Sequence, residues 1–261
     1  YDQRENEQLN RQANSDPLTG LLNRARFYSC VERALSRPRP AVVLMIDVDG
    51  FKDLNDTLGP DIGDRVLQEI SIRLKSVPPP ASHVARMGGD EFAVLLPDIT
   101  DINEAISFAQ TIVTLLAKPM TIAKNKIKLS VCCGLACAPL HAQEALELVS
   151  DADLALVEAK RLGSGRVLSF VQEFRSKATF RRSYGLELHR AVEAGEFMLF
   201  YQPQINLVSG RLTGAEALIR WRHPERGILP PISFLPALEK SPLVVAVGSW
   251  LLNEACAQAA Y

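Results

Sequence analysis

The sequence predicts an α/β fold in two consecutive units. Helical and strand-like segments alternate between residues 16 and 170, and the unbroken apolar run 41–46 (AVVLMI) is typical of a strand buried on both faces. After residue 172 the chain becomes charged and helical in pattern, and then a second hairpin follows. The 261 residues suffice for one large domain or two of moderate size.

The first unit is expected to span 15–172, after a polar linker helix at 1–14. Asp16-Pro17 predicts a helix start, with Pro at the first helical position and apolar spacing through Leu35. Two glycines, Gly88 and Gly89, lie between apolar runs and predict a hairpin. The other predicted elements are helices over 62–77, 101–117 and 142–162, and strands over 41–46, 127–136 and 166–170.

The second unit is expected at 196–261, joined to the first by a connecting helical segment over 173–195. A hairpin is predicted from 197–208 and 211–221 around Ser209-Gly210. A Pro- and Gly-rich stretch over 223–231 predicts a loop, and two helical stretches follow it.

Composition excludes several classes. A net charge of −1 argues against a nucleic-acid or membrane-surface binder. The longest apolar stretch, 243–252, is far shorter than the roughly 20 residues of a membrane span. Five cysteines without zinc-site spacing indicate a reducing, cytoplasmic location. The chain starts at Tyr1, so we expect a longer parent with an upstream sensory domain and room for a membrane anchor.

Carboxylates cluster where predicted strands end. The buried run 41–46 leads directly into Asp47-Val48-Asp49, and the hairpin carries Asp90 and Glu91. If the two strands are neighbours, Asp47, Asp90 and Glu91 meet at one edge of the sheet, where they suit Mg²⁺ and phosphoryl transfer. Backbone amides at Phe51-Lys52 are placed to bind a triphosphate. The alternative is two unrelated solvated turns.

Five segments together resemble a GGDEF domain in order and spacing. They are DPLTGLLNR (16–24), DVDGFKDLND (47–56), GD (63–64), RMGGDEF (86–92) and the helix from Asp153 to Lys160. The resemblance implies a palm-like, nucleotidyl-cyclase-like sheet with flanking helices. It also implies condensation of two GTP molecules, one on each protomer of a homodimer, to cyclic di-GMP and two pyrophosphates, with Mg²⁺ or Mn²⁺.

The same resemblance implies roles for single residues. Asp47 and Asp90, with the carbonyl of Val48, would bind the metal, and Glu91 would serve both the metal and the attacking ribose 3′-hydroxyl. By position, Asn55 and Asp64 would be the pair that recognises guanine. Lys52 and Lys160 would be the two lysines that contact the triphosphate. Without the resemblance, Asn55 is a turn residue and Lys160 a solvated helix lysine.

Two departures from the family pattern bear on function. Ser164 stands where a basic residue is usual, although Arg161 and Arg166 lie close in sequence. The product-inhibition motif Arg-x-x-Asp is expected just before the hairpin, but residues 79–82 read PPAS. We therefore expect a cyclase without product feedback at this site.

Residues 199–221 and 223–252 contain Tyr201-Gln202-Pro203, Glu216-Ala217-Leu218-x-Arg220-Trp221 and His223-Pro224. With these strings they resemble the start of an EAL domain, a cyclic di-GMP phosphodiesterase with a TIM-type barrel. Glu216 would be a metal ligand, and Gln202 and Arg220 would contact the dinucleotide. A (β/α)8 barrel needs at least about 200 residues. The chain is thus expected to hold an incomplete barrel, without phosphodiesterase activity, whose whole form belongs to the longer parent.

Three functions remain open from the sequence. The leading one is a diguanylate cyclase module. The second is a non-catalytic GTP-binding domain that regulates an attached EAL phosphodiesterase, and the third is a parent protein that does both.

Overall fold

The computed structural model describes residues 13–259 apart from residues 38, 80 and 240. The chain divides into two compact units, Tyr1–Arg175 and Ser176–Tyr261. Of the predicted linker helix over 1–14, residues 1–12 lie outside the described residues.

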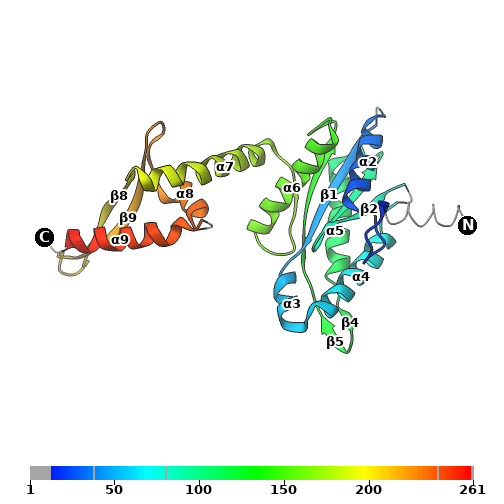
Figure 1. The fold of residues 1–261 in the computed structure, drawn as a ribbon, viewed down its shortest axis with the longest axis horizontal. Helices are drawn as coiled ribbons and strands as arrows, with labels where there is room; N and C mark the ends of the chain where they lie inside the picture. Colours follow the sequence, from blue (N-terminus) through cyan, green and yellow to red (C-terminus); the bar gives the residue numbers. More distant parts are fainter. Residues whose placement is uncertain (1–12, 38, 80, 240, 260–261) are drawn as a thin grey trace, which may run out of the picture. The chain divides into compact units, whose positions relative to one another are not determined.

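A five-stranded mixed sheet organises the first unit, in the order β2-β3-β1-β6-β7 (Figure 1). All neighbours are antiparallel except β6 and β7, which are parallel. The strands are β1 (Ala41–Val48), β2 (His83–Gly88), β3 (Glu91–Pro97), β6 (Val131–Ala138) and β7 (Val167–Ser169).

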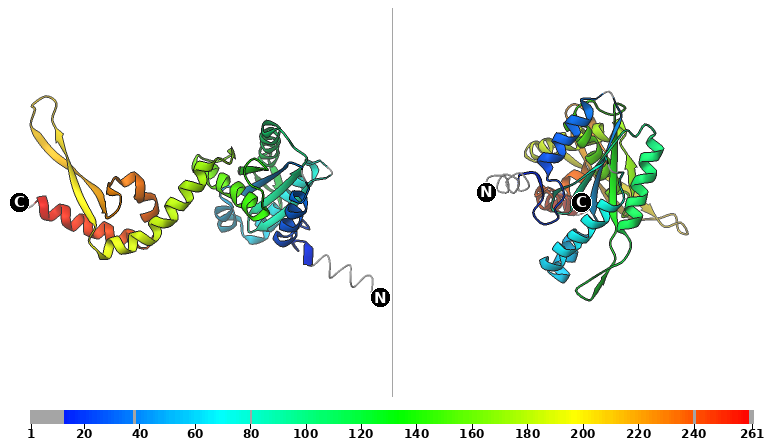
Figure 2. Two further views of the ribbon diagram at one scale, coloured as in Figure 1. Left: turned by 90° about the horizontal axis from the view of Figure 1, so that it is seen from above. Right: turned by 90° about the vertical axis from the view of Figure 1, so that its right-hand side faces the viewer.

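Helices cover both faces of this sheet (Figures 1 and 2). They are α2 (Arg24–Leu35), α3 (Phe51–Leu58), α4 (Pro60–Ser76), α5 (Ile102–Leu116) and α6 (Ala145–Arg161). Successive side chains of a strand point to opposite faces. In β1, Leu44 and Ile46 therefore join a core with α4 and α5, whereas Val43 and Met45 join a second core with α2 and α6. This explains why β1 is apolar from Ala41 to Ile46 and matches the α/β prediction.

The predicted helix start at Asp16-Pro17 is wrong. Helix α2 begins at Arg24, and its N-cap Asn23 accepts a hydrogen bond from the backbone N–H of Arg26. Asp16 instead accepts hydrogen bonds from the backbone N–H and the hydroxyl of Thr19, at 2.9 and 2.6 Å. This local side-chain bonding competes with helix formation and gives a turn.

A helix and a hairpin of the first unit were not predicted. Phe51–Leu58, where the sequence analysis expects turn residues at Phe51-Lys52 and Asn55, is helix α3. A small hairpin of β4 (Met120–Ile122) and β5 (Asn125–Ile127) precedes β6, so the strand predicted over 127–136 starts later. The turn of the β4–β5 hairpin is formed by Ala123 and Lys124, which have positive φ. Neither is Gly or Asn, so the sequence has no turn signal at this point.

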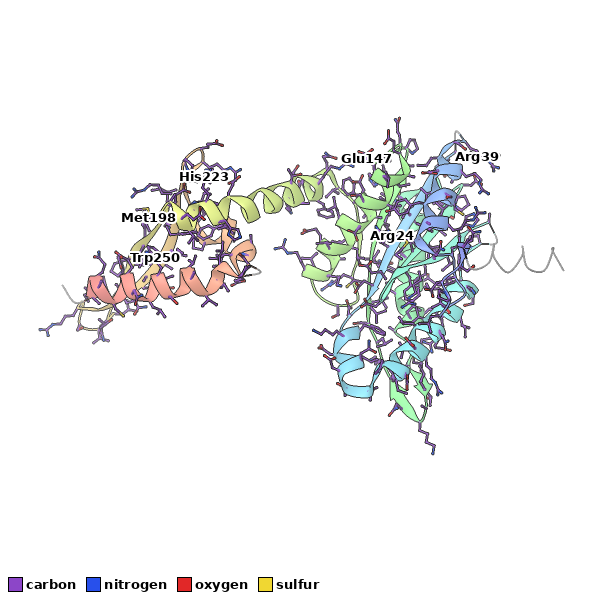
Figure 3. The ribbon with its side chains drawn as sticks, in the orientation of Figure 1. Arg24, Arg39, Glu147, Met198, His223 and Trp250 are labelled. Atoms are coloured by element: carbon purple, nitrogen blue, oxygen red, sulfur yellow. The ribbon has the colours of Figure 1, made fainter. Side chains whose placement is uncertain are left out.

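The second unit holds a three-stranded antiparallel sheet, β10-β9-β8, within the described residues. Trp221 and Phe234 are fully buried in its core, and the rings of Phe197 and Trp250 lie 6.3 Å apart (Trp250 is labelled in Figure 3). Its elements are α7 (Gln172–Glu193), which starts in the first unit, β8 (Phe197–Ile205), β9 (Leu212–His223), β10 (Gly227–Leu229), α8 (Pro231–Leu238) and α9 (Leu243–Ala259). The loop predicted over 223–231 thus contains the short strand β10, and the incomplete barrel stays a prediction.

Candidate functional site

Two carboxylates meet at one end of the five-stranded sheet. Asp47 in β1 pairs in register with Glu91, the first residue of β3, and Asp90 lies beside Glu91 in the hairpin turn. The Asp47 side chain is only 8% exposed. The expected convergence of the two strand ends is confirmed by this register, and it rules out the alternative of unrelated turns.

The turn that carries Asp90 is fixed by Arg86. Its guanidinium donates to the carbonyl of Gly89 at 2.7 and 3.0 Å and to the carboxylate of Asp16 at 3.2 Å. Gly89 has φ +51°, which at the first central position is typical of a type II′ hairpin turn. Arg86 thus ties the first sequence motif to the hairpin, a role that sequence reasoning missed although Arg86 lies inside the RMGGDEF string.

Lys160 reaches the cluster from the last turn of α6. Its Nζ donates to Oδ1 of Asp47 at 2.7 Å, across 113 residues of sequence. The Lys160 side chain is 44% exposed, so it can leave Asp47 for another anion without crossing the core. The structure therefore places Lys160 in the acidic cluster, in contrast to a solvated helix lysine.

The carboxylates perturb one another. Burial raises the pKa of Glu91, and the nearby charges of Asp153, Asp47 and Asp90 raise it further. Burial also raises the pKa of Asp47, while the hydrogen bond from Lys160 opposes this rise. A carboxyl with a raised pKa is a better proton acceptor once ionised, and such groups are frequent at catalytic sites. Asp153, on α6, belongs to this electrostatic cluster and was not predicted as a site residue.

The donor atoms of the cluster suit a hard cation. In the part of the chain that is described, no group of three or more His, Cys, Asp and Glu side chains is arranged to hold a metal ion. Mg²⁺ does not need one, since it usually takes one or two carboxylates and completes its shell with substrate phosphates and water. Asp47, Asp90 and the carbonyl of Val48 offer only oxygen ligands, so these residues fit Mg²⁺ that arrives with a phosphate-bearing substrate.

Asp49, two residues after Asp47, has a different function. Its Oδ2 accepts hydrogen bonds from the Ser130 hydroxyl at 2.8 Å and from the backbone N–H of Gly165 at 3.2 Å. It thereby fastens the loop after α6 to the end of β1. Ser164 lies exposed in that loop.

Asn55 is half-buried and packs against a glycine. It lies on α3, and its Oδ1 is buried without a hydrogen-bond partner among the described residues. Gly63 on α4 makes room for it, because a Cβ at Gly63 would overlap Asn55 Oδ1. Asp64 follows Gly63 and is exposed. The structure thus brings Asn55 next to the start of the Gly63-Asp64 pair.

The N-terminus of α3 follows the Asp47 segment. Its N-cap, Gly50, has φ +69° and makes no side-chain hydrogen bond to the first turn, so side-chain capping leaves these amides available. Lys52 is exposed in this turn. Helix N-termini with free amides and a nearby lysine favour phosphate groups.

The three predicted residues of the second unit lie on one face of a hairpin. Gln202 of β8 pairs in register with Glu216 of β9, and both side chains are exposed. Arg220 lies two pleats further along β9, with its guanidinium 5.3 Å from the ring centroid of Phe200.

Comparison with known families agrees with the geometry of the acidic cluster. Residues 13–166 match the GGDEF domain, described as diguanylate cyclase, and residues 186–261 match the EAL domain in part. The first match covers more than half of the chain. The chain belongs to the GGDEF family. A partial EAL domain follows its GGDEF domain.

Curated relatives align with almost the whole chain. It is 35% identical over 259 residues to the bifunctional diguanylate cyclase/cyclic di-GMP phosphodiesterase MucR of Pseudomonas aeruginosa, covering 98% of this chain and 38% of MucR. It is 35% identical over 257 residues to the signaling protein YkoW of Bacillus subtilis, covering 97% of this chain and 32% of YkoW. The chain therefore spans about a third of the length of these relatives.

Solved structures match the GGDEF domain. The GGDEF domain of TpbB (YfiN) from Pseudomonas aeruginosa is 35% identical, with a TM-score of 0.60, over 62% of this chain and 97% of that one. The coiled coil and GGDEF domain of DgcB from Caulobacter crescentus, solved with c-di-GMP, is 26% identical, with a TM-score of 0.60, over 64% and 91%. Among the described residues, none of the helices is long and apolar enough to cross a membrane.

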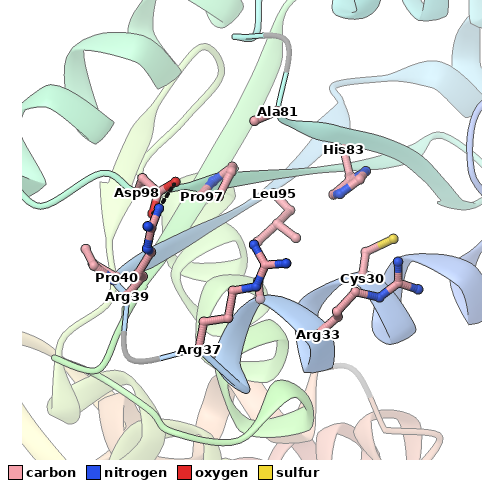
Figure 4. Close-up of a pocket in the computed structure, with 11 residues that line it drawn as sticks. Cys30, Arg33, Arg37, Arg39, Pro40, Ala81, His83, Leu95, Pro97 and Asp98 are labelled. Atoms are coloured by element: carbon pink, nitrogen blue, oxygen red, sulfur yellow. Dashed lines mark hydrogen bonds and ion pairs between the residues drawn. The ribbon is translucent and has the colours of Figure 1, made fainter.

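A separate cavity of about 270 Å³ opens in the GGDEF domain between the end of α2 and strands β2 and β3 (Figure 4). Arg33, Arg37 and Arg39 line it, and Ala81 belongs to its wall. None of the predicted site residues borders this cavity. The segment that would carry the product-inhibition motif thus borders a basic cavity and contributes neither Arg nor Asp.

Proposed function

We propose that the GGDEF domain of this chain is a diguanylate cyclase that condenses two GTP molecules to cyclic di-GMP and two pyrophosphates. The observation that carries the proposal is the cluster at the sheet edge. Asp47 lies opposite Glu91, Asp90 lies beside it, and Lys160 donates to Asp47 at 2.7 Å. Carboxylates and a lysine at this edge match the needs of a metal-bound triphosphate.

The neighbouring residues support GTP as the substrate. Asn55 presents a buried acceptor without a protein partner, and Asp64 adds an exposed carboxylate close by. Together they can accept hydrogen bonds from N–H groups of guanine. The α3 amides, Lys52 and Lys160 would hold the triphosphate, with Lys160 exchanging Asp47 for a phosphate oxygen.

Each condensation step transfers one nucleotidyl group. Glu91 accepts the proton of the ribose 3′-hydroxyl, whose oxygen bonds to the α-phosphorus of the second GTP, and the α–β bridging P–O bond breaks to release pyrophosphate. Bound by Asp47, Asp90 and the Val48 carbonyl, Mg²⁺ or Mn²⁺ would supply charge neutralisation of the triphosphate. Two such steps close the cyclic dinucleotide.

Each protomer would hold one GTP, so the active species is a homodimer with two sites facing each other. The rate per chain should therefore rise with protein concentration and level off once the dimer is saturated. A rate per chain that is constant down to the lowest concentration would contradict this.

A GTP-binding regulator is the second candidate. Ser164 replaces a usual basic residue and is exposed in its loop, and two relatives are named cyclic di-GMP phosphodiesterases, NbdA at 33% identity and PdeR at 32%. In this version the domain binds GTP without turnover and tunes an EAL barrel of a longer parent. There Glu216 would bind metal and Gln202 and Arg220 the dinucleotide.

Incubation of the purified chain with GTP and Mg²⁺, followed by chromatography for cyclic di-GMP and pyrophosphate, separates the two candidates. Product, lost on chelation of the metal, supports the cyclase. Bound GTP without product at high protein concentration supports the regulator. Absence of GTP binding would contradict both.

Glu91→Gln should abolish turnover while most GTP binding remains, because the amide keeps the shape of the side chain but accepts no proton. Turnover and binding are measured on the same preparation. Glu69→Gln is the matched control: Glu69 pairs with Arg73 on α4 at 2.9 Å, outside the cluster, and its loss should leave the rate unchanged. An unchanged rate in Glu91→Gln would exclude the proposed role.

A further inference from the structure

Gly63 occupies an interior position of helix α4 where glycine has a cost. Glycine in a helix interior is destabilising relative to alanine. Nothing in the backbone requires it, since Gly63 does not have the positive φ of the turn glycines such as Gly50 and Gly59. The reason for Gly63 must therefore be the space beside it.

Asn55 fills that space. A Cβ at Gly63 would overlap Asn55 Oδ1 and lie 2.9 Å from its Cγ and 3.3 Å from Phe51 Cζ. Helices α3 and α4 are separated only by Gly59, so the carboxamide is held in a notch between two consecutive helices.

The same carboxamide carries a second cost. Its Oδ1 is buried and accepts no hydrogen bond from any described residue. Buried acceptors are almost always paired, so an orphan calls for an explanation. A helical glycine and an unpaired acceptor at one point give the folded protein no stability, but they do give an N–H-bearing ligand a fixed acceptor.

We propose that Gly63 is a specificity-determining residue of the nucleotide site. Its missing side chain lets Asn55 Oδ1 sit where it accepts an N–H of a guanine base. This inference rests on the proposed binding of GTP and adds a residue that touches Asn55 and acts through it. Guanine carries two N–H donor groups on the edge where adenine carries one donor and one acceptor, so the position of a single acceptor affects the choice between them.

Gly63→Ala tests this role with one methyl group. The variant should fold, because alanine favours the helix and the groups that the added Cβ would crowd, the Asn55 carboxamide and the end of the Phe51 ring, are side chains that can shift. Affinity for α,β-methylene GTP, which cannot condense, should fall about tenfold, the effect of one lost hydrogen bond. Affinity for α,β-methylene ATP should not change. Both are measured by calorimetry in Mg²⁺, with thermal melting as the check on folding.

Two further variants make the test specific. Gly248→Ala, in helix α9, also replaces a helical glycine, but nothing lies within 4 Å of the added Cβ, so its nucleotide affinities should equal those of the wild type. Asn55→Ala should weaken binding of the GTP analogue but not of the ATP analogue. In the double variant with Gly63→Ala, it should lower the GTP analogue affinity little further, because both substitutions remove the same hydrogen bond.

The affinities of the variants show whether Gly63 acts on guanine recognition or only on packing. A fall in GTP analogue affinity alone, not additive with Asn55→Ala, supports the role. Unchanged affinities, or an equal fall for both analogues with a lower melting temperature, overturn it in favour of packing. If the wild type itself binds no GTP analogue, the proposed function fails and the role of Gly63 fails with it.

Discussion

At the residue scale, environment gives different roles to like side chains. Asp47 and Asp49 belong to one three-residue stretch, yet Asp49 accepts hydrogen bonds from the Ser130 hydroxyl and the Gly165 backbone N–H. The hydrogen bond to Asp47 comes from Lys160, whose side chain is 44% exposed. Asp49 therefore anchors a loop, whereas Asp47 remains open to exchange its partner for a cation.

His141 offers a pH-dependent prediction away from the acidic cluster. Its Nδ1 accepts the backbone N–H of Cys137 at 2.9 Å, which requires the neutral ring, and burial lowers its pKa below the ordinary 6.5. The unfolded chain therefore takes up the proton at higher pH than the folded chain. Its contribution to the free energy of unfolding is complete above pH 6.5 and declines as pH falls toward the folded pKa.

His141→Asn keeps an acceptor but cannot titrate, so denaturant unfolding between pH 7 and 5 should show a weaker pH dependence than in the wild type. His189→Asn, at an exposed position on α7, is the control and should leave the dependence unchanged. Identical pH profiles for His141→Asn and the wild type would refute the role of this hydrogen bond.

At the element scale, the start of α7 is fastened to α6. Arg175 donates to both carboxylate oxygens of Asp151 at 2.6 Å and to Glu147 at 2.8 Å (Glu147 is labelled in Figure 3). Its guanidinium also stacks 5.5 Å from the ring centroid of Phe170. Asp151 is only 1% exposed, so this arginine is the partner of a buried carboxylate.

Arg175→Ala should lower the free energy of unfolding by about 2 kcal/mol, because it leaves a buried carboxylate without its donor. Arg39→Ala removes a comparable pair, Arg39 with Asp98 at 3.3 Å, but both partners are more than half exposed. It should cost less than about 0.5 kcal/mol. Denaturant titration of the two variants measures the difference, and equal effects would show that burial of Asp151 does not matter.

At the scale of the whole molecule, product feedback depends on residues from several elements. The basic cavity of Figure 4 takes its arginines from α2 and the segment that follows it, and Ala81 comes from the segment before β2. Residues 79–82 supply neither the arginine nor the aspartate of the family's inhibition motif. The cavity does hold one carboxylate, Asp98, but it comes from the residue after β3 and already accepts from Arg39 at 3.3 Å.

Titration of the proposed cyclase with cyclic di-GMP should show no noncompetitive inhibition at concentrations up to those of GTP. Initial rates at several GTP concentrations distinguish the two forms of inhibition. Competition with GTP would indicate binding at the catalytic site and leave the prediction standing. Tight noncompetitive inhibition would contradict it and direct attention to the arginine cavity.

Most of the fold could be predicted because its signals are local. The apolar run of β1, the glycine pair of the hairpin and the four-residue spacing in α4 each specify one element without reference to the others. Prediction failed where a local pattern was ambiguous: Asp16-Pro17 resembles a helix cap, and the turn at Ala123-Lys124 lacks its usual residues. In both cases hydrogen bonding or packing stabilises a conformation that the local sequence pattern does not predict.

The sequence by itself determined which residues are candidates for the chemistry, because Asp47, Asp90 and Glu91 follow directly from where two strands end. Only the tertiary structure decided their partners. Packing of α6 on the sheet brings Lys160 to Asp47 across 113 residues, and packing of α4 on α3 buries the orphan acceptor of Asn55. The reason is physical: periodicity and turn chemistry act within a few residues, whereas these contacts exist only once helices and sheet are assembled.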